Sequence, residues 1–382
     1  MPEHVDYVVV GLGALGSATT HQLARRGFSV LGLERFELGH RRGASHDTSR
    51  ILRHSYHTPE YVRLTQEAYD DWARLASWSG RDLVTVVGGL DLFPPDPAIP
   101  LVDYTASLTE AGVDFELLDV DAIGERWPQF ALPTGTLGLY QDRGAVVPAG
   151  PGTAAMQTLA RQHGAVLREH AAVTSVTGTS VTLADGTTWS CGGVVLCADA
   201  WTDRLLAPLG VDLPLTVTLE QATYFAPESP ADFAPERMPL WIWMDEPSFY
   251  GFPCYGEPTV KAAQDCGGPT VDPDARDSEP DPGMLDLLVG HMSRMLPGSG
   301  SPLRSLRCQY TLTPDRDFVM DRVPGHPSLV VGLGAGHGFK FAPTFGRLLA
   351  DVVTGARDSV SPTFALDRPA LTDPSYAAHW LV

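Results

Sequence analysis

The chain has 382 residues, of which 43% are hydrophobic and 19% are charged. This composition is typical of a well-packed globular protein and excludes an intrinsically disordered one. The net charge of −19, with 27 Lys and Arg against 46 Asp and Glu, argues against nucleic acid or an anionic membrane as a partner, because both require clustered basic side chains. The length exceeds that of most single hydrophobic cores, so we expect two domains or one domain with a large insertion.

The five cysteines are scattered and form no C-x-x-C pair, which favours a reducing compartment over a disulfide framework or a zinc site. Residues 1–4 lead directly into an apolar run, without the basic region and cleavage site of a secretory signal. No run approaches the roughly 18 apolar residues of a membrane span. We therefore expect a cytoplasmic protein without a metal or a membrane partner.

The first 34 residues have the pattern of one βαβ unit. Residues 5–10 are a nearly continuous apolar run, typical of a strand buried on both faces of a parallel sheet. A helical pattern follows, and we expect it to end at Gly27. Residues 29–33 form a second apolar strand that ends at Glu34.

Three glycines and one carboxylate in this unit have the spacing of a dinucleotide-binding site. Gly11 permits a tight turn, Gly13 lets a pyrophosphate approach the backbone, and Gly16 lets the helix pack close to the strand. The helix N-terminus presents free N–H groups to the phosphates. Glu34 lies 21 residues after Gly13, where a carboxylate can bind a ribose hydroxyl. The unit therefore predicts a bound dinucleotide but does not distinguish FAD from NAD.

A long helix and two loops follow in the predicted order of elements. Thr58 and Pro59 are an N-cap and first-turn pair for an amphipathic helix that ends before Gly80. The Pro-rich residues 93–100 and the Gly-, Pro- and Asp-rich residues 267–282 are predicted loops.

A hairpin is predicted in the middle of the chain. Residues 165–191 alternate apolar and polar side chains around Asp185-Gly186, and they lead into a buried strand at 194–196. Short strands inserted between the strands of a parallel sheet distinguish FAD domains from plain nicotinamide domains.

Six segments occur in an order that points to one family: Gly11–Gly16, residues 45–56, Tyr250–Pro253, Lys261, Cys308–Tyr310 and Gly336–Phe341. With them, essentially the whole chain resembles the monomeric sarcosine oxidase and N-methyltryptophan oxidase family, within the glycine- and D-amino-acid-oxidase-like flavoproteins. The resemblance implies a mixed α/β (α+β) fold with two domains. These are an FAD-binding Rossmann-like domain (residues 1–85, 140–215 and 305–382) and an antiparallel-sheet substrate domain (residues 86–139 and 216–304).

The resemblance also implies how the cofactor is held. Cys308 matches the cysteine to which the family attaches FAD covalently. Arg50 lies against the flavin and stabilises the negative charge of its reduced form, with His46 close by. The remaining cofactor-binding residues implied by the match are Gly336, His337, Gly338 and Lys340.

The substrate residues implied by the family are two cations and an aromatic wall. Arg53 and Lys340 match the pair that holds a substrate carboxylate, the first through two parallel hydrogen bonds and the second as a point charge. Tyr250 and Tyr310 line the pocket, and we expect Trp241 to join them. Lys261 matches the lysine that activates oxygen, since a fixed positive charge lowers the cost of reducing O2.

Three departures from the family pattern bear on the substrate. The family carries a histidine after the residue matched by Lys261, whereas this chain has Gln264-Asp265. Residues 241–244 are more aromatic than a site for a very small amine requires. Asp199 stands where these flavoproteins commonly have glycine, and its side chain does not permit the same close backbone approach.

The expected function is that of an FAD-dependent oxidase acting on the CH–NH group of a secondary, N-methyl or N-alkyl amino acid. The products are an imine, which is hydrolysed to amine and aldehyde, and hydrogen peroxide. The amine must be neutral to react, so the rate rises with pH. Alternatives are the oxidation of a cyclic imino acid of pipecolate or proline type, a nicotinamide-dependent dehydrogenase and a catalytically silent flavin-binding protein. The expected partners are the amino acid and O2, and the expected state is a monomer.

Overall fold

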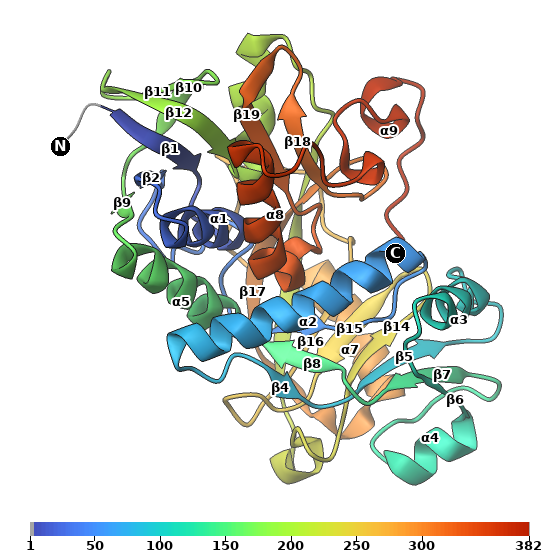
Figure 1. Ribbon diagram of the computed structural model, residues 1–382. Coiled ribbons are helices and arrows are strands. Elements are labelled where there is room, and N and C mark those ends of the chain that lie inside the picture. The colour runs from blue at the N-terminus through green and yellow to red at the C-terminus, as the bar shows by residue number, and fades with distance from the viewer. Residues whose placement is uncertain (1–3, 382) are drawn as a thin grey trace.

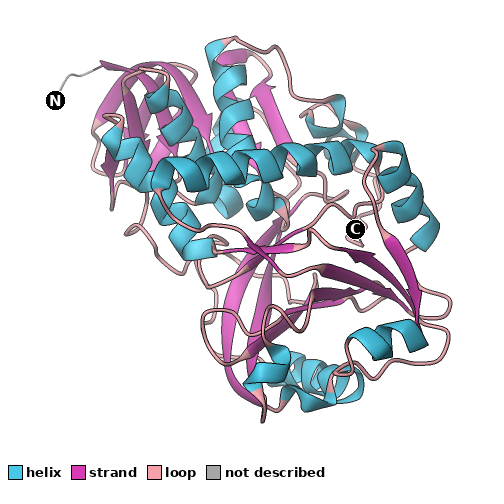
Figure 2. Cartoon of the chain, turned by 60° about the horizontal axis from the view of Figure 1, so that its bottom comes forward, coloured by secondary structure: helices cyan, strands magenta, loops and turns pink. Residues whose placement is uncertain are grey.

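The computed structural model describes residues 4–381 of the chain (Figure 1). The first three residues of the N-terminal run discussed above lie outside this range. Two eight-stranded sheets and a small three-stranded sheet form the framework, with helices packed on both large sheets (Figure 2).

The first sheet contains the N-terminal βαβ unit. Its core has parallel strands in the order β12-β1-β2-β9, and β19 pairs parallel with the other edge of β12. An antiparallel meander, β10-β11, extends from β12, and β18 pairs with β19. The strands are β1 (His4–Val10), β2 (Val30–Leu33), β9 (Val166–Arg168), β10 (Val173–Val176), β11 (Ser180–Leu183), β12 (Thr188–Leu196), β18 (Val319–Val323) and β19 (His326–Leu333).

The predicted βαβ unit is confirmed, with boundaries that differ by one or two residues, whereas the hairpin predicted over 165–191 is shorter and is preceded by β9 and β10. Helix α1 is Ala14–Arg25, so it ends two residues before Gly27, which takes a φ of 90° after the helix. The predicted hairpin is β11-β12, and Asp185-Gly186 lie in its turn. The predicted buried strand at 194–196 is the end of β12, where it pairs with β1.

The second sheet is antiparallel except for the parallel pair β14-β5. Its order is β17-β13-β16-β15-β14-β5-β7-β6. The strands are β5 (Gly89–Phe93), β6 (Glu116–Asp119), β7 (Leu137–Gln141), β13 (Thr216–Ala226), β14 (Leu240–Trp243), β15 (Phe249–Phe252), β16 (Val260–Gln264) and β17 (Ser301–Leu312). The mixed α/β fold class is thereby confirmed. The predicted domain boundaries at 139/140 and 304/305 fall inside β7 and β17, and the division into domains stays a prediction.

Helix α2 crosses the molecule between the two large sheets (Figure 1). It spans Pro59–Ser79, begins at the Thr58 N-cap and ends at Gly80 with a φ of 63°, as predicted. The small sheet, β3 (Arg50–Leu52), β8 (Ala145–Val147) and β4 (Thr85–Val86), lies beside it. The other helices are α3 (Leu101–Glu110), α4 (Val120–Arg126), α5 (Ala149–Gln162), α6 (Thr202–Leu206), α7 (Pro282–Met295), α8 (Ala342–Thr354) and α9 (Pro369–Thr372).

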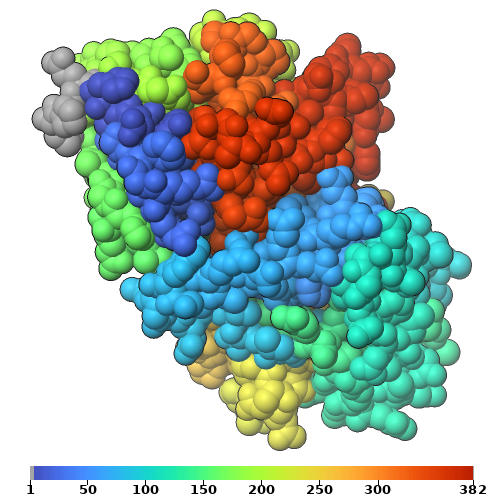
Figure 3. Space-filling view, viewed as in Figure 1, coloured from blue at the N-terminus to red at the C-terminus, as the bar shows by residue number. Residues whose placement is uncertain are grey.

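None of the helices within residues 4–381 is long and apolar enough to cross a membrane. The N-terminal helix α1 and the C-terminal helix α8 lie side by side, and the blue and red segments border each other on the surface (Figure 3). There α1 packs closely on α8, and a Cβ atom on Gly346 would lie 2.5 Å from Ala18 of α1. Glycine at 346 therefore permits this helix contact.

We predict that Gly346→Ala lowers the free energy of unfolding by about 1–3 kcal/mol, because an added methyl group forces α1 and α8 apart. Urea unfolding followed by circular dichroism measures the change. Gly290→Ala in α7 is the control, since its nearest neighbour would lie 3.6 Å away. That variant should gain about 0.5–1 kcal/mol from the lower backbone entropy of alanine. Equal effects in the two variants would contradict the packing argument.

Candidate functional site

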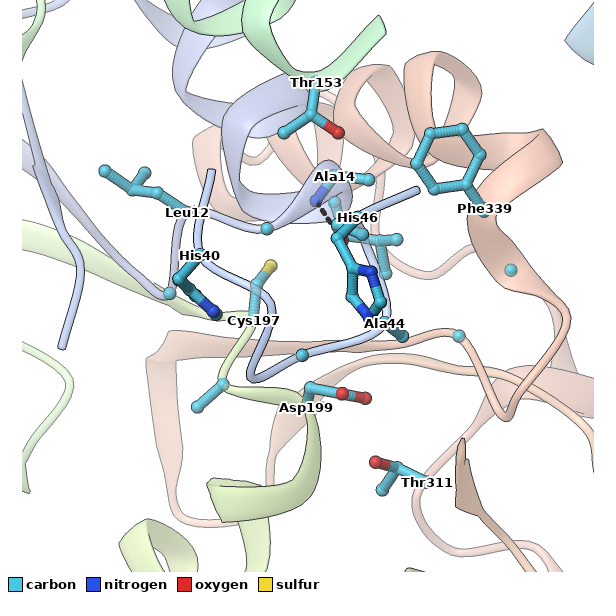
Figure 4. A pocket seen from close by; sticks show the side chains of 18 of the residues that line it. Leu12, Ala14, His40, Ala44, His46, Thr153, Cys197, Asp199, Thr311 and Phe339 are labelled. Carbon is cyan, nitrogen blue, oxygen red and sulfur yellow. Dashed lines mark hydrogen bonds between the residues drawn. The ribbon is translucent and has the colours of Figure 1, made fainter. Parts of the chain in front are cut away.

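A cavity of about 1160 Å³ lies where the carboxyl ends of β1, β2 and β12 face the second sheet. One end is lined by the glycine turn after β1 and by Glu34, and the other by Arg53, Lys340, Tyr250 and Tyr310. The segments that line it come from distant parts of the chain (Figure 4). Glu34 and the glycine turn therefore share one space with Arg53, Lys340, Tyr250 and Tyr310.

The glycine turn leaves no room for side chains at two of its positions. A Cβ atom on Gly11, whose φ is 87°, would lie 2.3 Å from the carbonyl oxygen of Cys197, and one on Gly16 would lie 1.8 Å from the carbonyl oxygen of Gly11. Gly13 is the N-cap of α1 and contributes no capping side chain. The first turn of α1 carries no acidic residue that would repel an anion, although the N–H of Ala14 donates to Ser45 Oγ at 2.8 Å.

Glu34 lies just after β2 and lines the end of the cavity that the glycine turn also lines. It accepts hydrogen bonds from the N–H groups of Leu12 (2.8 Å) and Phe36 (3.0 Å), and His40 Nε2 lies 3.3 Å away. Burial opposes its ionisation, but the hydrogen bonds from His40 and the backbone outweigh it and lower the pKa of Glu34. The carboxylate is therefore ionised and acts as a hydrogen-bond acceptor, and its binding of a ribose hydroxyl stays a prediction.

Asp199 follows β12 and begins the short 3-10 helix η1 (Asp199–Trp201) with a φ of 47°. This left-handed conformation favours glycine, which explains why a glycine suits this position. Its Oδ2 atom is buried without a hydrogen-bond partner, as are the polar side-chain atoms of Gln309 and Thr311. Burial raises the pKa of Asp199, which these two neighbours oppose. Figure 4 shows the carboxyl group on the same side of the cavity as Thr311.

His46 lies in the segment that leads into β3, and Arg50 is the first residue of that strand. The Arg50 guanidinium donates to the carbonyl oxygens of Ser49 (2.8 Å), Ala44 (2.8 Å) and His46 (2.9 Å), so it holds the shape of this segment. Burial, then the charge of Arg50, lowers the pKa of His46 to about 4, and its Nε2 atom has no partner. Both side chains line the cavity, the neutral imidazole beside the cation.

Cys308 and Lys261 line a small adjoining chamber together with Arg50, Tyr250 and Tyr310. Cys308 lies on β17 and has the same strand face as Leu306 and Tyr310. Burial raises the pKa of its thiol to about 11.

The Lys261 ammonium is held by a network that sequence reasoning missed. Its Nζ atom lies 2.5 Å from Asp47 Oδ2, 3.1 Å from the Ser49 carbonyl oxygen and 3.2 Å from Ser49 Oγ. Burial lowers the pKa of Lys261 to about 8 despite Asp47, and the lysine in turn helps lower that of Asp47 to about 2 against the effect of burial. The only sequence signal was the position of Asp47 between His46 and Arg50.

The two predicted carboxylate-binding cations differ in their surroundings. Arg53 Nη1 lies 3.0 Å from Asp91 Oδ2 on β5, in a buried ion pair. Lys340 Nζ donates to Tyr56 Oη (2.8 Å) and to the His337 carbonyl oxygen (3.1 Å). Within residues 4–381 it has no ion pair with a carboxylate. Burial, then the charges of Arg53 and Arg316, lowers the pKa of Lys340 well below its usual value.

The Gly336–Gly338 turn places Lys340 and also lines the cavity. Gly336 has a φ of 79°, and a Cβ atom there would lie 2.9 Å from Leu312. His337 Nδ1 lies 3.0 Å from Tyr56 Oη, and its Nε2 lies 3.0 Å from the carbonyl oxygen of Arg316. The turn is thus tied to two neighbouring segments.

The aromatic wall is partly as predicted. Tyr250 and Tyr310 line the cavity, with their hydroxyl oxygens 3.4 Å apart. Trp241 was wrongly placed there: it is 0% exposed and packs with His291 beneath the second sheet. Because side chains alternate along β14, Ile242 faces the cavity instead. Asp265, noted only as a departure from the family, also lines it.

Comparison with known proteins agrees with this geometry. The family described as FAD dependent oxidoreductase matches residues 6–352. The chain is 35% identical to the monomeric sarcosine oxidase of Streptomyces avermitilis (91% of this chain, 93% of the relative) and 31% identical to the peroxisomal sarcosine oxidase of Homo sapiens (91% of each). The open form of NikD, an amino acid oxidase essential for nikkomycin biosynthesis, superimposes with a TM-score of 0.84 at 30% identity, covering 95% of this chain and 97% of NikD. The resemblance drawn from the motifs is confirmed.

The residues present fit FAD. The turn has space only for backbone at Gly11 and Gly16, it leads into a helix N-terminus, and Glu34 is an ionised acceptor at the end of β2, as a bound dinucleotide requires. His46 and Asp199 both line this cavity, and within residues 4–381 the buried Nε2 of His46 and Oδ2 of Asp199 have no hydrogen-bond partner of suitable geometry. No cluster of three or more His, Cys, Asp or Glu side chains suited to a metal occurs within residues 4–381.

We predict that Asp91→Asn lowers the free energy of unfolding by about 3–5 kcal/mol, because it leaves the buried Arg53 charge unpaired. Chemical denaturation of the holoprotein measures the loss. Glu110→Gln breaks the exposed Arg63–Glu110 pair and should cost at most about 1 kcal/mol. A small loss of unfolding free energy in Asp91→Asn would mean that Asp91 does not compensate the buried charge of Arg53.

Proposed function

The chain belongs to the FAD dependent oxidoreductases, and on that premise we propose that it is an oxidase of secondary amino acids with O2 as the electron acceptor. The observation that carries the proposal is one cavity that joins the glycine turn to a buried lysine, Lys340, which has no acidic partner among the described residues. The names of the curated relatives, sarcosine oxidases, support an N-methyl amino acid as substrate.

Bound FAD would supply the redox chemistry, taking two electrons from the CH–NH group and passing them to O2. The residues that would hold it are the glycine turn, Glu34, Arg50 and the Gly336–Gly338 turn. Cys308 would provide a covalent tether, since it faces the chamber beside Arg50 and Tyr310.

Lys340 would bind the carboxylate of the amino acid, with Arg53 beside it as a donor held in place by Asp91. The bound anion would compensate the ammonium, which is costly to bury alone. Tyr250, Tyr310 and Ile242 would pack on the apolar part of the substrate and exclude water. The amine must lose its proton before oxidation, so flavin reduction should speed up as pH rises.

A cyclic imino acid is the second candidate substrate. The aromatic and aliphatic wall formed by Tyr250, Tyr310, Ile242 and Phe252 suits a ring of five or six atoms at least as well as a methyl group. A nicotinamide-dependent dehydrogenase is not supported, because the family match is to FAD enzymes. We further propose a monomer in the cytoplasm, the first in line with the names of the monomeric relatives.

The function is tested by mixing the purified holoprotein with a panel of N-methyl and cyclic amino acids without oxygen. We expect at least one to bleach the flavin absorbance and to yield hydrogen peroxide when oxygen is admitted. A flavin that no amine bleaches would instead indicate a catalytically silent flavin-binding protein.

We predict that the flavin is covalently bound through Cys308. After acid precipitation, the yellow colour should remain in the pellet for the wild type and move to the supernatant for Cys308→Ala. Cys254→Ala, which changes a half-buried cysteine outside the cavity lining, should keep its colour in the pellet. Colour in the wild-type supernatant would contradict the tether.

We predict that Lys261→Met slows flavin reoxidation by O2 on the order of 100-fold, because it removes a buried positive charge, and leaves flavin reduction largely intact. In the wild type the reoxidation rate should fall as pH rises through about 8, where the Lys261 ammonium loses its proton. Stopped-flow absorbance measures each half-reaction separately. Lys261→Arg should retain fast reoxidation and lose the inflection. Equal losses in both half-reactions of Lys261→Met would contradict this role.

A further inference from the structure

Asp265 presents a carboxylate to the substrate end of the cavity. It follows β16 and lines the cavity with Arg53, Tyr56, Tyr310 and Lys340. Its side chain is 19% exposed, whereas that of its partner Arg316 is 2% exposed. The ion pair is thus one-sided: the guanidinium lies in the protein interior and the carboxylate borders the cavity.

The carboxylate is fixed by its backbone and by its side chain. Arg316 donates two hydrogen bonds of 2.8 Å, one to each carboxylate oxygen. Arg316 is itself held, since it also donates to the carbonyl oxygen of Trp380 at 2.6 Å. The Asp265 N–H donates to the carbonyl oxygen of Ser248 at 2.9 Å. A group held at this many points is preorganised to bind a ligand.

The pairing with Arg316 leaves acceptor capacity toward the cavity. An ionised carboxylate has about four acceptor positions, and a bidentate guanidinium occupies two of them. Since Arg316 neutralises the charge, Asp265 can accept further N–H groups without the cost of an isolated buried anion.

The substrate end therefore presents an acceptor and a cation to the same ligand. Lys340 has no ion pair with a carboxylate within residues 4–381, and Asp265 has no other cation besides Arg316 among its ion pairs there. An α-amino acid carries a carboxylate and a nitrogen with N–H groups one carbon apart. The arrangement matches both ends of such a molecule.

We propose that Asp265 binds the nitrogen of the substrate and accepts its N–H, while Lys340 and Arg53 hold the carboxylate. This inference rests on the proposed function, and it names the substrate class that the site selects: amino acids with at least one N–H, as opposed to plain carboxylic acids. Because the carboxylate favours the ammonium form, it also raises the pKa of the bound amine.

Binding is tested with 2-aminoisobutyrate and pivalate, which differ only in an ammonium group in place of a methyl group. The first has no hydrogen on the carbon that bears its nitrogen, so it binds without being oxidised. Perturbation of the flavin absorbance in the holoprotein gives both dissociation constants. We expect the wild type to prefer 2-aminoisobutyrate by about 10- to 100-fold, the value of a hydrogen bond to a charged group.

The variant Asp265→Asn should lose this preference and still bind pivalate through Lys340. Because it leaves Arg316 unpaired, the double variant with Arg316→Gln is measured beside it. Asp274→Asn is the matched control: it removes a carboxylate of the same cavity lining, one that contacts Arg35 and Arg204 instead, and should retain the preference.

Asp265→Asn should also move the pH dependence of flavin reduction by an oxidised substrate to lower pH, because the bound amine loses its proton more easily. A wild type that binds the two ligands equally, or a preference that survives in both Asp265 variants, would overturn this inference alone. A wild type that binds neither ligand would contradict the proposed carboxylate site itself.

Discussion

Buried charges in the wall of the cavity have to be compensated, and this requirement determines how the substrate end is built. Arg53 is paired with Asp91, Lys261 with Asp47 and Arg316 with Asp265. An isolated charge in such surroundings is unfavourable by several kcal/mol. Lys340 has only neutral oxygens around it within residues 4–381. Lys340 is thus left without a carboxylate partner among the described residues, and the proposed carboxylate ligand would provide one.

The charged residues of the cavity come from segments of both large sheets. The cavity therefore depends on how these sheets pack. Asp91 lies on β5 and Asp265 follows β16, two strands of the second sheet, whereas Lys340 lies in the short 3-10 helix Gly338–Phe341 that follows β19 of the first. Asp47 lies in the segment that leads into the small sheet. The charges can meet only when the two large sheets are packed against each other, so the assembly of the core also completes the site.

The local and periodic features of the chain were predictable from sequence. Such features depend on a few neighbouring residues. Strand β1 ends just before Gly11, Thr58 caps α2, and Glu34 reaches back to the glycine turn, all as the sequence pattern indicates. Contacts between residues that are distant in the sequence were not predictable from it. Nothing in the sequence around Lys261 points to Asp47, and nothing near Arg53 points to Asp91, because both contacts join segments that are distant in the chain. Trp241 was misplaced since an apolar run does not show which face of a strand each residue takes, and a shift of one residue reverses the face.

The contacts of Lys340 have a consequence for how ligand binding and protons are connected. Burial and two nearby guanidinium groups lower its pKa in the absence of an anion, and an arriving carboxylate raises it again. Binding is then accompanied by proton uptake, and by thermodynamic linkage affinity for the carboxylate weakens as the solution becomes more alkaline. Heat released on binding would depend on the ionisation enthalpy of the buffer. The pocket would thus take up a proton each time that it binds a carboxylate ligand.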